Sequence, residues 1–110
     1  MERFVPVRER LAFSTEKMRK VGLVDTASLF CDAYCFEPGQ EQKGHRHEVG
    51  DKLYYVLEGT GRIRVGEDER TVEAGALVCA PAGEEHGVVN PGPGRLVLLV
   101  MMAPKPGAPS

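Results

Sequence analysis

Three histidines stand at positions where their imidazole nitrogens could converge on one point. His45 and His47 are separated by a single residue. On an extended backbone, residues i and i+2 project from the same face, so these two rings would lie close together. Imidazole is a common ligand of divalent zinc, iron, nickel, copper and manganese. The pair suggests part of a metal site, although such pairs also occur by chance on protein surfaces.

The third histidine, His86, lies in a second stretch that repeats the order of features in the first. Residues 39–59 and 75–90 each contain a glycine turn, an extended run, a second turn and histidine. Taken alone, His86 could be a turn histidine whose ring bonds to the backbone. Because the two stretches share one pattern, the three histidines are predicted to hold one divalent transition metal ion. Iron, zinc, manganese and nickel are all compatible with imidazole ligands.

Short strands joined by tight turns must position these histidines. The chain has thirteen glycines and eight prolines, and its apolar runs recur about every ten residues, which predicts an all-β barrel or sandwich. The expected strands are 27–36, 44–48, 52–57, 62–65, 70–72, 76–80, 86–89 and 96–102. One short helix is expected from Ser14 or Thr15, whose oxygen could cap it, to Lys20, with Gly22 ending it.

Composition narrows the class of protein. A chain of 110 residues fits one domain. Fourteen basic and sixteen acidic residues are well mixed, which disfavours nucleic acid as a partner. No apolar run approaches the ~20 residues that span a bilayer, and the N-terminus lacks the apolar core of a signal peptide. Three irregularly spaced cysteines do not resemble a secreted disulfide framework, so a cytoplasmic location is expected.

The two patterned stretches resemble the two motifs of the cupin superfamily, in particular of its small single-domain bacterial members. The first motif, Gly-x5-His-x-His-x3–4-Glu-x6-Gly, is matched by Gly39, His45, His47 and Gly59. The second motif, Gly-x5-Pro-x-Gly-x2-His-x3-Asn, is matched by Gly75, Pro81, Gly83, His86 and Asn90. The resemblance implies a double-stranded β-helix, or jelly-roll, barrel that is often dimeric. It also implies a metal near the barrel mouth, held by three histidines and a glutamate.

The resemblance covers nearly the whole chain and divides it into three parts. Residues 27–103 are expected to form the cupin barrel. Residues 1–26 are expected to form an N-terminal arm and short helix that pack on the barrel. The proline-rich segment 104–110 is expected to be a disordered tail. A homodimer is expected from the resemblance and from the strongly apolar run at 96–102.

One residue departs from the motif, because no glutamate stands at the expected position. Counting back from Gly59 places Lys52 there, whereas counting forward from His47 places Asp51 there, so either could align. If Tyr54 faces the interior, the period of two puts Lys52 inside and Asp51 outside. An inward lysine would remove a negative ligand, repel the metal and anchor an anionic substrate. Alternatively, the side chain could extend past the rim into solvent.

Two functions remain open on the sequence alone. One is a mononuclear divalent-metal enzyme, dioxygenase-like or isomerase-like, acting on a small polar substrate. In it, Lys52 would bind an anionic group or carry a proton, and Tyr54 would orient the substrate. Some thiol dioxygenases of the superfamily use a three-histidine iron site, so the missing acid is compatible with catalysis. The alternative is a non-catalytic module that binds a sugar or another small molecule.

Overall fold

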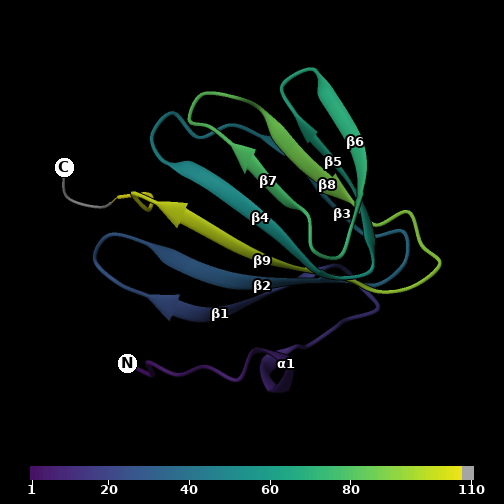
Figure 1. The fold of residues 1–110 in the computed structure, drawn as a ribbon, viewed down its shortest axis with the longest axis horizontal. Helices are drawn as coiled ribbons and strands as arrows, with labels where there is room; N and C mark the ends of the chain where they lie inside the picture. Colours follow the sequence, from purple (N-terminus) through teal and green to yellow (C-terminus); the bar gives the residue numbers. More distant parts are fainter. Residues whose placement is uncertain (108–110) are drawn as a thin grey trace.

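The computed structural model describes residues 1–107 and shows two antiparallel sheets packed face to face (Figure 1). One sheet has the strand order β1-β2-β9-β4-β7 and the other has the order β3-β8-β5-β6. The strands are β1 (Arg19–Asp25), β2 (Phe30–Phe36), β3 (Glu41–His45), β4 (Asp51–Glu58), β5 (Thr60–Val65), β6 (Asp68–Glu73), β7 (Leu77–Ala80), β8 (His86–Val89) and β9 (Leu96–Ala103). This confirms the predicted all-β jelly-roll barrel.

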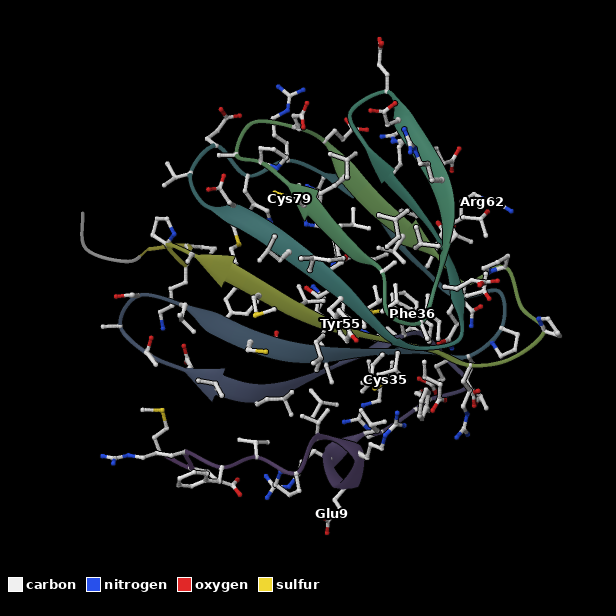
Figure 2. The ribbon with its side chains drawn as sticks, in the orientation of Figure 1. Glu9, Cys35, Phe36, Tyr55, Arg62 and Cys79 are labelled. Atoms are coloured by element: carbon white, nitrogen blue, oxygen red, sulfur yellow. The ribbon has the colours of Figure 1, made fainter. Side chains whose placement is uncertain are left out.

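The alternation of side chains along the two central strands builds the core. β4 pairs with β9 so that Tyr54 lies opposite Val100 and Val56 lies opposite Leu98. Residues directly opposite in a ladder point to the same face. All four of these side chains are buried between the sheets, and each apolar one contributes roughly 1.5–3 kcal/mol on burial. Figure 2 shows the same alternation in β2, where Cys35 and Phe36 point to opposite sides of the strand.

Asn90, the last residue of the second motif, fastens the long turn between β8 and β9. Its Nδ2 donates hydrogen bonds to the carbonyl oxygens of Phe36, at 3.2 Å, and Gly94, at 2.9 Å. Its Oδ1 accepts from the N–H of Gly92 at 2.9 Å. Because the side chain is almost fully buried, these bonds satisfy polar groups that would otherwise destabilise the turn. The motif asparagine therefore has a structural role.

The short helix lies earlier in the chain than predicted. Helix α1 spans Val7–Arg10 and runs beneath the five-stranded sheet (Figure 1), whereas the predicted helix at 14–20 is absent. Instead, β1 begins at Arg19 and pairs along β2, with a bulge between Gly22 and Val24. A helix of about two turns is marginal by itself, and pairing with a sheet edge supplies more backbone hydrogen bonds. Gly22 therefore lies inside a strand.

The C-terminal segment contacts the β1–β2 hairpin. The Nζ of Lys105 lies 2.6 Å from Oδ1 of Asp25, and its backbone N–H donates to the carbonyl of Ser28 at 2.9 Å. Residues 108–110 of the predicted tail lie outside the described residues. The predicted division of the chain into arm, barrel and tail stays a prediction. Among residues 1–107, no helix has the length and apolar character needed to cross a bilayer.

Candidate metal centre

The three histidines come together at one end of the four-stranded sheet. His45 ends β3 and pairs in register with His86, which begins β8. His47 follows two residues after His45, in the loop before β4. One ligand nitrogen from each ring lies within 4.8 Å of the other two. The histidine pair and the distant histidine are therefore brought together by one strand pairing.

Backbone carbonyls orient two of the rings. Nδ1 of His45 lies 3.0 Å from the carbonyl oxygen of Lys43, and Nδ1 of His86 lies 3.1 Å from that of Glu84. A carbonyl accepts only from a protonated nitrogen, so these contacts assign the proton to Nδ1 and leave the Nε2 lone pair available. A ligand histidine typically has this second contact, which fixes its tautomer and ring orientation.

One nitrogen of this cluster lacks a partner. Nε2 of His86 is buried and has no hydrogen bond within the described part of the chain. A buried polar atom without a partner costs about 1–3 kcal/mol, and such atoms usually indicate an unseen ligand or water. Three imidazoles with an available lone pair are a donor set that suits a divalent transition metal. The residues present therefore fit such an ion.

Burial favours the neutral form of two of the rings. The pKa of His86 is lowered to about 4, chiefly by burial and also by the nearby Lys52, His45 and His47, while the Glu84 carbonyl opposes the shift. The pKa of His47 is also lowered, first by burial and then by His45 and Lys52. His86 is therefore neutral at pH 7, which is the form of imidazole that coordinates metal.

Lys52 points into the barrel. Its side chain is 2% exposed, and its strand position lies between Ala80 of β7 and Met102 of β9. Its neighbour Asp51 is exposed and accepts a hydrogen bond from the Ala82 N–H at 3.0 Å. The structure thus places the lysine, and not the aspartate, on the interior face.

The interior lysine lies among aromatic rings. Nζ of Lys52 is 5.2 Å from the ring centroid of Tyr34 and 5.4 Å from that of Tyr54. Within residues 1–107, no carboxylate lies within the 4.0 Å of an ion pair from this Nζ. Burial lowers the pKa of Lys52 to about 8, with a further contribution from Lys20, while Asp32 opposes the shift. The ammonium group is therefore poorly compensated.

Tyr54 is the tyrosine that faces the histidines. Its ring is fully buried, and its centroid lies 6.1 Å from that of His86. Its hydroxyl has no hydrogen-bond partner among residues 1–107. Burial, assisted by Tyr34, raises the pKa of Tyr54, so the hydroxyl stays protonated and can donate. Tyr55 alternates to the opposite face of β4.

Two further charged residues, which sequence reasoning did not assign to the site, lie beside this interior. Lys20 on β1 lies opposite Tyr34 in the ladder, and Asp32 lies two residues before Tyr34 on the same face of β2. The alternation in β2 predicts that Asp32 and Tyr34 share a face. No signal marked Lys20, because its segment was assigned to a helix. The side of the barrel facing the histidines is therefore more polar than the motifs alone indicate.

Comparison with known proteins supports the fold and shows the family. The family model described as "Cupin domain" matches residues 33–102. The chain belongs to the cupin family. That membership confirms the resemblance carried by the two motifs. It also agrees with the histidine cluster, which lies where the two motifs meet in this cupin barrel.

Three proteins are similar to this cupin over different fractions of its length. The crystal structure of TT1209 from Thermus thermophilus is 39% identical with a TM-score of 0.92, covering 96% of this chain and all of that one. The tetracenomycin polyketide synthase protein TcmJ of Streptomyces glaucescens is 29% identical over 84% of this chain and 64% of its own length. A 5-nitrosalicylic acid 1,2-dioxygenase from Bradyrhizobium sp. is 32% identical over 59% of this chain and 31% of its own. This chain spans less than two thirds of each of these two curated relatives.

The buried lysine makes folding stability depend on pH in a defined direction. The pKa of Lys52 is about 8 in the fold, against 10.5 for a lysine in solvent, and this difference corresponds to about 3 kcal/mol. The charged ammonium therefore destabilises the fold fully below pH 8, progressively less between pH 8 and 10.5, and not at all above pH 10.5. Lys52→Met in metal-free protein should raise the free energy of unfolding at pH 7 by about 2–3 kcal/mol, with a gain that shrinks across that window. Urea unfolding of both proteins at pH 7, 9 and 10.5 measures this difference in the free energy of unfolding.

The exposed Lys43→Met variant is the matched control and should show no pH-dependent gain. A Lys52→Met gain that stays constant from pH 7 to 10.5 would contradict a depressed pKa. A constant gain in stability would be explained by burial of the apolar methionine side chain alone.

Proposed function

We propose that this cupin holds one divalent transition metal ion on His45, His47 and His86 and uses it to bind and activate a small polar substrate. The observation that carries this proposal is the unpartnered, buried Nε2 of His86 beside the two other imidazoles. Three protein ligands without a carboxylate leave coordination positions for substrate or water. Iron, zinc, manganese and nickel all suit this ligand set.

The protein side chains have separate roles in this proposal. When bound, the ion supplies Lewis-acid chemistry or, if it is redox-active, oxygen chemistry. The Tyr54 hydroxyl donates a hydrogen bond to a substrate oxygen and orients it beside His86. The Lys52 amine, with a pKa near 8, accepts or gives a proton at Nζ close to neutral pH. The surrounding apolar core excludes bulk water from both groups.

Two reaction classes are compatible with these roles. A dioxygenase-like reaction is supported by the relative named 5-nitrosalicylic acid 1,2-dioxygenase. An isomerase-like reaction needs only a Lewis acid and a group that moves a proton, which Lys52 can supply. We place the dioxygenase-like class first because it is the one that a relative's name supports.

A non-catalytic binding module is the second candidate. It is favoured by one observation, which is that Lys52 occupies the interior position where the motif has a carboxylate. A positive charge in place of a ligand weakens metal binding. In that case the barrel would capture a small molecule or sugar without converting it.

We also propose that the protein is a homodimer and that it is cytoplasmic. On the outer face of the five-stranded sheet lies a cleft of about 590 Å³ with an apolar lining. Its lining residues include Val24, Leu29, Cys31, Leu53, Cys79 and Met101. Apolar patches of this kind often mark protein–protein interfaces. The three cysteines are free thiols, which supports a reducing compartment.

The metal proposal predicts about one equivalent of ion per chain. Untagged protein incubated with iron, zinc, manganese or nickel and then desalted should retain one equivalent by mass spectrometry of the metal. His86→Ala and His47→Ala should each lower the affinity at least tenfold, because each removes one of three ligands. The control is Glu48→Gln, which changes an exposed carboxylate next to His47 in the first motif. This variant should bind the metal normally. Retention below about a tenth of an equivalent with every metal refutes the site.

Turnover distinguishes the enzyme from the binding module. Iron-loaded protein should consume oxygen with some member of a panel of hydroxybenzoic acids, thiols and diketones. Zinc-, manganese- or nickel-loaded protein should be assayed for sugar isomerisation. Tyr54→Phe should lower kcat/KM about tenfold with metal content unchanged, because it removes one hydrogen bond worth roughly 0.5–1.5 kcal/mol. Tight ligand binding without turnover in any assay would favour the module.

The dimer proposal predicts that a charged side chain introduced into the apolar cleft shifts the protein from dimer towards monomer. Sedimentation at micromolar concentration should show a dimer, and Leu53→Lys should weaken it at least tenfold by burying an unpaired charge. Val49→Lys is the matched control, since Val49 is 68% exposed and lies in the loop before β4. A monomeric wild-type protein, or equal effects of both variants, would contradict an interface at the cleft.

A further inference from the structure

Two lysine ammonium groups lie close to one buried aromatic ring, that of Tyr34. Nζ of Lys20 lies 5.3 Å and Nζ of Lys52 lies 5.2 Å from the ring centroid of Tyr34. Lys52 is buried, whereas Lys20 is exposed on the edge strand β1. One ammonium group therefore lies at the protein surface and the other lies in the interior near the histidine cluster.

An open groove leads to the outer lysine. It has a volume of about 530 Å³ and is lined by residues of β1 and β3, the edge strands of the two sheets, and by the residues just before β1. Lys20 and Gln42 are among its lining residues. Gln42 also belongs to the interior, because its Oε1 is buried and has no hydrogen-bond partner within residues 1–107. The groove is therefore polar, and Gln42 links its lining to the interior into which Lys52 points.

The buried ammonium of Lys52 has no ion-pair partner in the described part of the chain. The carboxylate of Asp32 is half-buried nearby, and Lys20 is exposed at the sheet edge. Across residues 1–107, none of these three groups belongs to an ion pair within 4.0 Å. A divalent ion on neutral histidines adds two further positive charges. Buried charges are normally paired, so the Lys52 ammonium, which is unpaired within residues 1–107, favours an anion as its partner.

The surroundings of Lys52 favour a flat anion. The faces of Tyr34 and Tyr54 border its ammonium group, which leaves a site bounded by planar rings. The backbone on both sides of Lys52 is engaged in ladders with β7 and β9. Phosphate sites usually use unpaired backbone N–H groups or arginine forks, and this strand position presents neither. A planar carboxylate suits one ammonium between two rings better than a tetrahedral phosphate does.

We propose that the substrate is a small organic acid whose carboxylate lies on Lys52 while an adjacent oxygen reaches the metal site, with Lys20 as the specificity-determining residue at the entrance. The inference rests on the proposed function, because the second contact of the acid is the ion on the three histidines. The acid would satisfy two groups, which are the unpartnered hydroxyl of Tyr54 and the Lys52 ammonium, which has no ion pair within residues 1–107. Neutral sugars would leave the Lys52 charge without a partner.

Paired acids and amides test the charge requirement. Zinc-loaded protein is titrated in a calorimeter with lactate and lactamide, with salicylate and salicylamide, and with inorganic phosphate. Each amide keeps the shape and the adjacent oxygen of its acid but lacks the charge. At least one acid should bind ten or more times tighter than its amide, and tighter than phosphate. Equal binding of acids and amides overturns the proposal, and so does a preference for phosphate.

Substitutions test the two lysines. Lys52→Met should weaken binding of the preferred acid at least tenfold while zinc content stays at one equivalent. Lys20→Met should weaken it about threefold and reduce its dependence on salt. Arg62→Met removes a charge that points away from the barrel (Figure 2) and should change nothing. Lys52→Gln repeats the test with a polar side chain should the methionine variant fold poorly.

The outcomes separate this inference from the function on which it rests. Wild-type protein that retains no zinc overturns the proposed metal site and the inference with it. Zinc retention with acid binding unaffected by Lys52→Met and Lys52→Gln overturns the inference alone. Acid binding that depends on Lys52 but responds equally to Lys20→Met and Arg62→Met removes Lys20 from the specificity role.

Discussion

The register between β4 and β9 decides what the interior of this barrel contains. With Lys52 opposite Met102 and Tyr54 opposite Val100, Lys52, Tyr54 and Val56 of β4 are buried in the interior. A shift by one residue would turn Asp51 inward and Lys52 outward, because side chains in a strand alternate with a period of two. It would also expose Tyr54 and Val56, whose burial stabilises the core. The apolar residues of β4 therefore hold the lysine in the interior.

The two sheets contribute different chemistry to one compartment. The four-stranded sheet and its loops supply the three imidazoles, while the five-stranded sheet supplies Lys52, Tyr54 and the aromatic ring of Tyr34. The imidazoles form a cluster with lone pairs and no charge, and the facing sheet provides positive charge with hydroxyl donors. Metal coordination and anion recognition are thus separable in the chain, since they depend on different strands. This separation lets Lys52 be changed without removing a metal ligand.

Much of this arrangement follows from the sequence, and the rest depends on contacts between distant strands. Glycine spacing and the positions of His45, His47 and His86 predicted the barrel, which the structure confirms, and the period of two predicted that Lys52 faces inward. The helix predicted near Lys20 was wrong because pairing of β1 with β2 overrides the weak local preference. The lack of an ion pair to Lys52 within residues 1–107 could not be predicted, since it depends on which side chains the other strands bring to the interior.

The placement of the compartment between two sheets has a consequence for the motions of the barrel. β1 and β3 are edge strands of different sheets, so no backbone ladder ties them together across the groove. A ligand held by the imidazoles on one side and by Lys52 on the other would act as a non-covalent cross-link between the sheets. Opening of the barrel along this seam would then require ligand release, and amide hydrogens of the two edge strands would exchange more slowly in the occupied protein.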